Sequence, residues 1–511
     1  MANIFNSIQA RFKKRNKFDL SHESRLTTEF GRLTPILCEP VLPNDRFSIA
    51  TTLKVQFAPM VFPVMQKFSA YVHYFFVPNR LLWDKWEDFI TGGDDGLQEP
   101  SYPVIQFSDE FIESVEDLNF NNVVCGPSSL WDYLGFPSID PSDGLGRNHD
   151  FDALPFKAYQ LIYNEWYRDQ NLESEFEIHS EMSGIQDNDD DHAFEFGLLS
   201  LRNRAWRKDY FTSALPDPQR GPDVTLPLVG DSEIDITFKS NPLGTVLRGP
   251  GIFDGDNLES RTSGAQQDTV GYIVATDGSS SRDVPLQVDN SENLQGNLRF
   301  DDEENGIRSA TINEVRRAFA IQRWYELAAR AGSRYIEQIF AHFGIRSSDA
   351  RLQRPEFIGG GVVPVYIGDV LQTSETQETP LGTPAGVGQA MGSCRLKKRY
   401  MTFEEHGWII GILSIIPQAA YFQGIPRKFL KRDKFDFAWP LLANLGEQEI
   451  ESQELVFNPS LTKEQNKQGF GYTPRYAEYK YGAGQVHGDF RDSLLDFHDA
   501  RVFDGVPHFH R

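Results

Sequence analysis

Cysteine is scarce in this chain of 511 residues, which has only Cys38, Cys125 and Cys394. No Cys-x-x-Cys pair occurs, so the sequence supports neither a zinc module nor a disulfide framework, and a reducing cytosol is the expected place of synthesis. Long hydrophobic runs are also missing, because the longest spans 408–416, whereas about 20 residues are needed to cross a bilayer. The first residues lack the apolar stretch of a signal peptide. We therefore expect a soluble protein that is not exported by the usual signal and is not inserted into a membrane.

Motifs of common enzymes are absent as well. The dipeptide Gly-Lys never occurs, which excludes a standard P-loop, and there is neither a Gly-x-Ser-x-Gly elbow nor a His-Glu-x-x-His motif. Scattered polar residues such as His487, Asp489 and His498 have no fixed ligand spacing, so they are more typical of a surface than of a metal site. The sequence therefore predicts no catalytic residue, no cofactor and no bound metal.

Basic residues are outnumbered, with 50 Lys and Arg against 73 Asp and Glu and a formal net charge of −23. Such acidity argues against a protein that coats duplex DNA, because that affinity comes from neutralising phosphates. The charge is unevenly distributed, since residues 217–308 hold 17 acids and 7 bases, whereas residues 1–17 hold no acid. The bases of this first segment are Arg11, Lys13, Lys14, Arg15 and Lys17. Residues 1–17 are either a solvated, frayed terminus or an arm that contacts nucleic acid.

Aromatic residues are abundant, at 13% of the chain with 39 Phe, and this density predicts a folded protein with a buried core. Some aromatics lie beside cations in three clusters. The clusters are Arg202, Arg204, Arg207 and Lys208 with Trp206 and Tyr210; Arg395, Lys397, Lys398 and Arg399 with Tyr400; and Arg427, Lys428, Lys431, Arg432 and Lys434 with Phe429 and Phe435. Single-stranded nucleic acid is bound by such combinations, through base stacking and phosphate neutralisation. The alternative is ion pairing within an acidic protein.

Hydrophobic periodicity predicts both strands and helices. Residues 47–57 alternate with period two, which indicates a strand with one buried face. Residues 68–77 and 408–416 are apolar on both faces, so we expect two central strands that are far apart in sequence. Helical spacing over 311–344, interrupted at Gly332-Ser333, and over 156–170 predicts helices that pack against a core.

Long polar stretches separate these elements. Residues 371–393 resemble an exposed loop, and the acidic segment 217–308 contains candidate short strands such as 270–275. Loops of this length in a compact domain are usually functional or form small subdomains.

Four further segments occur in an order that is familiar from a known family. They are residues 18–35 (FDLSHESRLTTEFGRLTP), 71–80 (YVHYFFVPNR, followed by two Trp), 163–168 (YNEWYR) and 405–408 (EHGW). Together with the strand that enters at residue 43, they resemble the major capsid proteins of the Microviridae, small icosahedral bacteriophages with circular single-stranded DNA. The likeness covers both ends and most of the chain, and the acidic segment resembles the insertion of the gokushovirus branch.

This resemblance implies a mainly β fold, an eight-stranded antiparallel jelly roll of the viral capsid type with long loop insertions and a few packing helices. Residues 18–216 and 309–511 are then the jelly-roll domain, 1–17 an internal basic arm, and 217–308 a surface protrusion at the threefold axis. Sixty copies are expected to close a T=1 shell.

The implied function is that of a structural subunit, not an enzyme. Its expected partners are other copies of itself, the single-stranded DNA genome, other phage structural or internal scaffolding proteins, and a host surface receptor. We expect assembly in the bacterial host cytoplasm and residence in the virion. The competing interpretations from sequence are a β-rich carbohydrate-active hydrolase and a lectin-like binding protein.

Overall fold

The computed structural model describes most of the chain in separate stretches. They are residues 16–56, 64–94, 97–105, 125–138, 149–178, 197–222, 224, 312–332, 334–346, 348–371, 384–395, 399–443 and 445–505, with short strands between 245 and 295. Only the backbone is described for those short strands and for residues 366–371, 384–395 and 399. The chain divides into two compact units, one of Met1–Gly221 with Tyr325–Arg511 and one of Pro222–Trp324.

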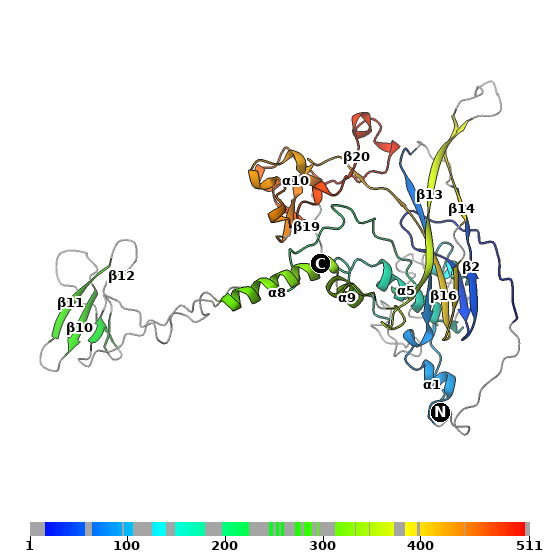
Figure 1. Cartoon of the computed structure of the whole chain (residues 1–511), viewed down its shortest axis with the longest axis horizontal. Coiled ribbons are helices and arrows are strands. Elements are labelled where there is room, and N and C mark those ends of the chain that lie inside the picture. Colours follow the sequence, from blue (N-terminus) through cyan, green and yellow to red (C-terminus); the bar gives the residue numbers. More distant parts are fainter. Residues whose placement is uncertain are drawn as a thin grey trace. The chain divides into compact units, whose positions relative to one another are not determined.

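A six-stranded antiparallel sheet forms the centre of the first unit (Figure 1). Its strands follow the order β1 (Thr34–Val41), β16 (Gly407–Pro417), β4 (Phe68–Pro78), β13 (Glu356–Leu371), β14 (Pro384–Arg395) and β3 (Thr52–Gln56). Neighbours in space are therefore distant in sequence, and β13 and β14 form a hairpin that reaches beyond the other strands (Figure 1).

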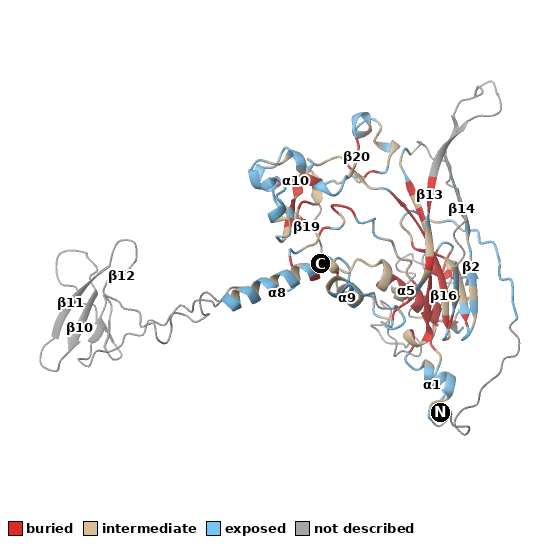
Figure 2. Cartoon of the chain, viewed as in Figure 1, coloured by how far each residue is buried: buried red, intermediate tan, exposed pale blue. Residues whose placement is uncertain are grey.

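The two predicted central strands are confirmed, and the structure places them as direct neighbours in the sheet. β16 pairs with β4 along its whole length, and Ile410 lies opposite Phe75. Because side chains alternate between the faces of a strand, Phe75 enters a core on one face and Val72 a second core on the other. Both strands are buried on both faces, as their apolar sequences predict (Figure 2).

The alternating segment 47–57 forms two strands instead of the one predicted. β2 (Arg46–Ile49) pairs with β15 (Arg399–Thr402), whereas β3 pairs with β14, and the break lies at Ala50-Thr51. The predicted alternation is nevertheless correct, because odd-numbered residues from Phe47 to Val55 are partly or fully buried and even-numbered ones are exposed.

The larger core is built between the sheet and the predicted helix over 156–170. This segment forms α5 (Leu154–Ile162), which continues into a π-helical turn, η3 (Tyr163–Tyr167). Tyr159 of α5 is fully buried, and its hydroxyl group donates to the Leu33 carbonyl (2.8 Å), which ties the helix to the start of β1. The prediction of a helix packed on the core is confirmed here.

The second predicted helix is divided at Gly332, as its sequence suggested, into α8 (Ile312–Ala331) and α9 (Tyr335–Phe343). Its expected packing is wrong for the single chain. Only Ala328 of α8 is buried, whereas Phe319 of α8 and Phe343 of α9 are 66% and 77% exposed (Figure 2). Within one chain, the aromatic stripe of these helices therefore faces outward.

Short elements complete the first unit. They are the strand pairs β5 (Val104–Ile105) with β6 (Phe151–Asp152), β17 (Ala420–Tyr421) with β20 (Gly484–Gln485), and β18 (Glu447–Glu451) with β19 (Gly469–Pro474); the helices α1 (Trp86–Thr91), α4 (Leu130–Tyr133), α10 (Ser452–Leu455) and α11 (Lys463–Asn466); and the 3-10 turns η1 (Asn79–Leu81), η4 (Arg427–Phe429), η5 (Lys434–Asp436), η6 (Pro440–Leu442), η7 (Ala477–Tyr479), η8 (Gly488–Arg491) and η9 (Leu495–Phe497).

The second unit contains a four-stranded antiparallel sheet. Its order is β12 (Leu294–Gln295), β11 (Ser281–Val288), β10 (Gly271–Thr276) and β7 (Thr245–Arg248), and β8 (Ile252–Asp254) pairs separately with β9 (Asn257–Glu259). The strand predicted at 270–275 is confirmed as β10.

The fold is thus mainly β with few helices, which confirms this part of the predicted fold class. Among the residues that the structure describes, no helix is both long and apolar enough to cross a membrane.

Candidate nucleic-acid interface

A hollow of about 400 Å³ lies beside β4, and cations and aromatic rings line it together. Its lining residues are His73, Phe75, Trp166, Tyr167, Arg204, Ala205, Trp206, Arg207, Lys208 and Phe357. None of these residues is acidic, although the chain has 73 Asp and Glu. We call this hollow the aromatic–basic pocket.

Four separate segments place these side chains. His73 and Phe75 lie on the face of β4 that α5 covers, and Phe357 lies opposite Phe75 on β13. The π-helical turn supplies Trp166 and Tyr167. Single-turn π-helices are rare and are frequent at functional sites.

The fourth segment, residues 202–208, is held by backbone hydrogen bonds to the chain just before β1. Leu33 N donates to the Arg202 carbonyl (2.9 Å), and Arg204 N donates to the Gly31 carbonyl (2.6 Å). The Arg202 guanidinium donates to Gln160 Oε1 (2.7 Å) and to the Gly197 carbonyl (3.0 Å), so it serves the fold and not a ligand. Residues 204–208 are thereby presented along the pocket.

Arg204 is a largely buried cation without a carboxylate partner among the residues described. Its Nη1 donates to Ser414 Oγ (2.8 Å), and its guanidinium carbon lies 4.0 Å from the Tyr71 ring centroid and 5.6 Å from that of Tyr167. Desolvation by burial lowers the pKa of Arg204. Ring faces attract a cation but do not neutralise it, so the positive charge persists in the pocket.

Two exposed cations lie at the pocket mouth. Lys208 pairs with Asp169 and donates to the Thr212 carbonyl (3.1 Å). The Arg207 guanidinium, by contrast, forms no ion pair within the described part of the chain. Arg207 is therefore available for an anion, whereas Lys208 is partly neutralised.

His73 keeps its imidazole neutral inside this positive surrounding. Burial, followed by the charge of Arg204, lowers the pKa of His73 from 6.5 to about 4. Its Nδ1 lies 2.7 Å from the Tyr167 hydroxyl, and the two rings are stacked with centroids 5.9 Å apart. Tyr167 stays protonated, because burial raises the pKa of its hydroxyl group. The pocket charge therefore comes from its arginines.

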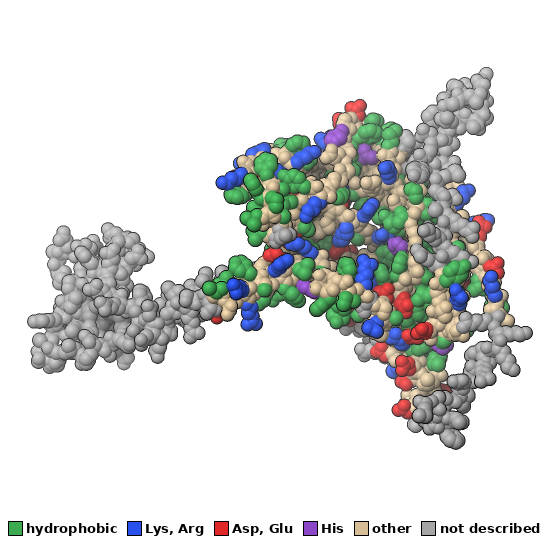
Figure 3. All heavy atoms as spheres, in the orientation of Figure 1, with side chains coloured by type: hydrophobic (Ala, Val, Ile, Leu, Met, Phe, Trp, Pro, Cys, Tyr) green, Lys and Arg blue, Asp and Glu red, His purple; other side chains and the backbone are tan. Residues whose placement is uncertain are grey.

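The cluster at 427–434 is divided between internal and exposed cations. Arg427 pairs with Glu454 (2.7 Å), and Lys431 pairs with Glu478 (3.4 Å). Lys428 lies over the Phe429 ring (4.9 Å), which is 61% exposed, and Lys434 lies in the same way over Phe435. Figure 3 shows Lys and Arg together with hydrophobic side chains over the region of α10, whereas Asp and Glu gather near α1. Ion pairing thus accounts for only part of this cluster.

The other predicted nucleic-acid contacts lie mostly outside the described residues. Arg11, Lys13, Lys14 and Arg15 are among them, and Lys17 is exposed. In the cluster at 395–400 only the Tyr400 side chain is described; it is exposed, and the Arg46 guanidinium lies over its ring at 5.5 Å. The predicted role of these residues stays a prediction.

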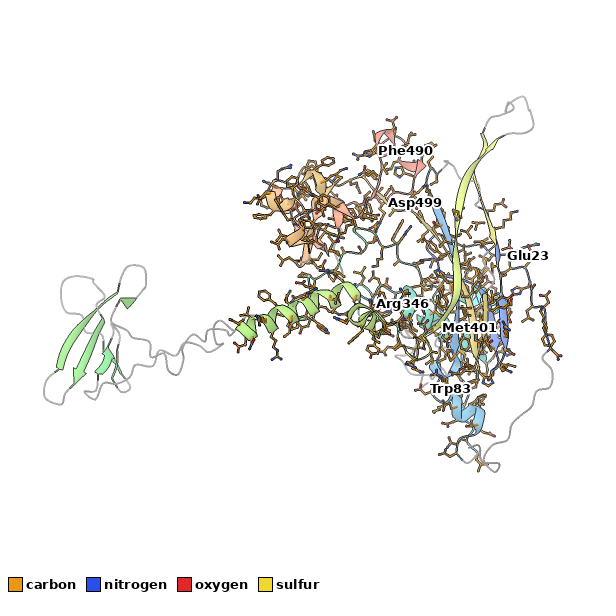
Figure 4. All side chains as sticks on the ribbon, viewed as in Figure 1. Glu23, Trp83, Arg346, Met401, Phe490 and Asp499 are labelled. Atoms are coloured by element: carbon orange, nitrogen blue, oxygen red, sulfur yellow. The ribbon has the colours of Figure 1, made fainter. Side chains whose placement is uncertain are left out.

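The described polar residues at 487–499 make contacts within their own segment. His498 Nε2 lies 2.7 Å from the Phe490 carbonyl oxygen, a contact within the segment itself. Phe490 and Asp499 lie near β20, far from Met401 and Trp83 (Figure 4). Across the described stretches, no group of three or more His, Cys, Asp or Glu residues is arranged to hold a metal ion.

Sequence reasoning identified four members of the aromatic–basic pocket, Arg204, Trp206, Arg207 and Lys208, because they are adjacent in sequence. It missed His73 and Trp166 as site residues, because they were assigned to a strand and to a packing helix, and it missed Phe357, which no predicted element contained. No local pattern indicates their approach, because β4, η3 and β13 meet only through the sheet topology.

Comparison with known proteins gives matches over nearly the whole chain. A family profile described as "Capsid protein (F protein)" matches residues 6–511. The chain is similar to "Capsid protein VP1" of Chlamydia phage 1, with 32% identity over 570 residues, 99% of this chain and 90% of that protein. The protein of the same name from Bdellovibrio phage phiMH2K is 32% identical over 96% of this chain and 86% of its own length. That of Spiroplasma virus 4 is 29% identical over 94% and 83%.

Proposed function

Because this chain belongs to the phage capsid protein (F protein) family, we propose that its copies close into a T=1 icosahedral shell of sixty around circular single-stranded DNA. Family membership confirms the resemblance to the gokushovirus-like Microviridae capsid proteins and the structural, non-enzymatic role. The alternatives of a carbohydrate-active hydrolase or a lectin are not supported. The family match over residues 6–511 is the observation that carries the proposal.

The strand order supports a jelly roll as the shell-forming fold. β1, which comes first in the chain, lies beside β16, and the next neighbours are β4 and β13. Connections that return the last long strand to the side of the first are typical of Greek-key architectures, of which the jelly roll contains two. The eight-stranded barrel is a proposal that goes beyond the six-stranded sheet.

The charge distribution supports a shell with an acidic outside and basic inside. The segment 217–308 contributes −10 of the net −23, whereas Arg11, Lys13, Lys14, Arg15 and Lys17 add +5 near one end of the chain. Phosphates require counter-charge, so the basic arm 1–17 belongs on the inner wall. The acidic segment belongs outside as a threefold protrusion that contacts the host surface.

The remaining partners follow from this arrangement. Sixty copies of the chain supply one another's neighbours, and other phage structural or internal scaffolding proteins assist assembly in the host cytoplasm. The protrusion meets a host surface receptor. Binding to the genome is sequence-independent, because phosphate contacts and base stacking carry no base code.

Particle mass tests the shell. Sixty chains of 58.2 kDa give about 3.5 MDa of protein. Expression with the phage partner proteins and analysis by light scattering and electron microscopy should yield particles of this mass that contain DNase-protected DNA. A monomer or small oligomer under all conditions refutes the proposal.

Deletion of about residues 225–300 tests the protrusion separately. Shells should still form, because these residues lie in a compact unit of their own, but adsorption to host cells should be lost. Retained infectivity of particles built from the shortened chain contradicts the role in host contact.

A further inference from the structure

The aromatic–basic pocket contains positive charge that the described fold does not neutralise. Arg204 is largely buried and has hydrogen bonds and ring contacts but no described carboxylate partner. Arg207 is exposed and has none either. Two other largely buried arginines of the same unit do have carboxylate partners, since Arg354 lies 3.6 Å from Glu165 and Arg427 lies 2.7 Å from Glu454. In a chain of net charge −23, a pocket without acids indicates a site for an anion.

The ring faces of the pocket indicate that this anion also has a planar group. Phe357 packs edge-on or tilted against His73, Phe75 and Trp166, with centroids 5.5–5.7 Å apart, and remains 42% exposed. Trp206 is half-buried, with the Arg501 guanidinium 5.1 Å from its ring centroid. An exposed ring braced by other rings is a preorganised stacking surface.

We propose that the aromatic–basic pocket binds one unpaired nucleotide of single-stranded DNA, with its base stacked on Phe357 or Trp206 and its phosphate on Arg207. This inference rests on the proposed function, because it assigns to a definite place the DNA that the shell encloses. A volume of about 400 Å³ fits a single small-molecule group, at the low end of the range for ligand sites. It leaves no room for a base pair with both backbones.

The lining also determines the selectivity of the site. It contains no Asn, Gln, Asp or Glu side chain to read adenine or cytosine edges, and Arg207, the side-chain type that reads guanine, is assigned to the phosphate. His73 is neutral, and its Nδ1 lies within hydrogen-bond distance of the Tyr167 hydroxyl, so it adds no positive charge for a phosphate at neutral pH. Stacking and charge alone make the site tolerant of base identity.

Two single substitutions separate the two contacts. Arg207→Gln removes the exposed cation, and Phe357→Leu removes the exposed ring while keeping an apolar side chain against Phe75. Arg346→Gln is the matched control, since Arg346 is also an exposed arginine over an aromatic ring (4.9 Å from the Phe340 ring centroid) without a described carboxylate partner, but it lies outside the pocket lining and outside the three basic clusters.

The assay is fluorescence anisotropy of a labelled ten-nucleotide oligodeoxythymidylate, titrated with the full-length, unassembled chain at several salt concentrations. Arg207→Gln should weaken binding about tenfold and reduce the slope of log affinity against log salt by about one. Phe357→Leu should weaken binding about tenfold with an unchanged slope, because stacking releases no counterions. Arg346→Gln should stay within about twofold of the unchanged chain.

Several outcomes overturn the pocket. They are unchanged oligonucleotide affinity in both pocket variants, an equal loss in Arg346→Gln, or equal affinity for a duplex of the same length. An acidic peptide is then added as a competitor. If it abolishes oligonucleotide binding in the unchanged chain but not in the pocket variants, the pocket is assigned to a protein partner instead. If only the pocket assignment fails, the chain without substitutions still forms DNA-filled shells. If the proposed function fails, the same chain forms no shell or binds no single-stranded DNA.

A second measurement does not depend on the folding of variants. Ultraviolet irradiation of assembled, DNA-filled particles should cross-link DNA to the peptides that contain Phe357 and Trp206. Cross-links confined to peptides remote from both residues overturn the inference.

Discussion

We predict that the two partners of the ion pair between Arg427 and Glu454 contribute unequally to the stability of the fold. Arg427 Nη1 donates to Glu454 Oε1 (2.7 Å), and the Arg427 side chain is 25% exposed whereas that of Glu454 is 1% exposed. Glu454 also accepts from the Tyr210 hydroxyl (2.9 Å) and from Glu451 N (3.0 Å). The network therefore joins η4, α10 and the segment after residue 208.

Removal of the cation should cost more than removal of the anion. Arg427→Met leaves the Glu454 carboxylate buried without its counter-charge, which should lower the free energy of unfolding by about 3–5 kcal/mol. Glu454→Gln should lower it by about 1–2 kcal/mol, because the Arg427 guanidinium reaches water and keeps its bond to the Glu449 carbonyl (2.7 Å). The double variant should be more stable than the sum of both losses predicts, since it leaves no buried charge.

The pH dependence of stability provides an independent test of this asymmetry. Desolvation by burial raises the pKa of Glu454 even in the presence of Arg427. A carboxyl group with a raised pKa in the folded state stabilises the fold below its unfolded pKa and loses this contribution as pH rises through the folded pKa. In Arg427→Met the counter-charge is gone and the pKa rises further, so this variant should be less destabilised at pH 5 than at pH 7.

Urea denaturation of the unassembled chain, followed by far-ultraviolet circular dichroism at both pH values, measures all four members of this cycle. A larger loss for Glu454→Gln than for Arg427→Met refutes the reasoning. So does a cycle that is additive within about 0.5 kcal/mol, because it shows no coupling between the two groups.

Three further predictions concern the same unit. The pKa of His73 is about 4 in the fold and 6.5 ordinarily, so its neutral form stabilises the fold above pH 6.5, and up to about 3 kcal/mol of unfolding free energy should be lost as pH falls towards 4. His73→Gln should flatten this pH dependence in urea titrations, and an unchanged pH dependence contradicts the prediction. Gly360→Ala should lower the unfolding free energy by more than about 2 kcal/mol, because its Cβ atom would lie 2.4 Å from the Val72 carbonyl oxygen in β4. Gly482→Ala, whose Cβ atom would have no atom within 4 Å, should leave stability unchanged, and equal thermal midpoints of the two variants refute the prediction. Trp131→Ala should cost about 3–5 kcal/mol, as Trp131 is fully buried among three Phe rings, and a loss below about 1 kcal/mol in urea contradicts it.

The strands that sequence predicted well are those whose hydrophobic pattern depends on burial alone. β4 and β16 are apolar on both faces because cores lie on both sides of the sheet. Their predicted bounds differ from the observed ones by no more than one residue at each end. The break between β2 and β3 could not be predicted, because the alternation continues through Ala50 and Thr51 while the hydrogen-bond partner changes. Period-two patterns report which face is buried, not which strand is the neighbour.

The hairpin of β13 and β14 was missed for a different physical reason. Residues 371–393 were predicted as an exposed loop, although β14 begins at Pro384, and no strand was predicted over β13. In β13, Gly360 is required because the backbone of β4 passes too close for any Cβ atom. Glycine in a strand marks such close approach as well as turns, and the sequence does not distinguish the two cases.

The cations of this chain illustrate why adjacency in sequence does not establish a binding function. Arg202 and Arg207 belong to one predicted cluster, yet Arg202 is bound to Gln160 and Gly197, and Arg207 has no described ion pair. Arg427 and Lys428 are neighbours, yet Arg427 balances a buried carboxylate and Lys428 lies over an exposed ring. Each arginine that the fold uses has an acceptor placed by tertiary structure, so the cations left without one are identified only after the fold is known. The net charge of the chain therefore says little about the DNA binding proposed above, which rests on the local charge of Arg204 and Arg207 beside the exposed Phe357 ring.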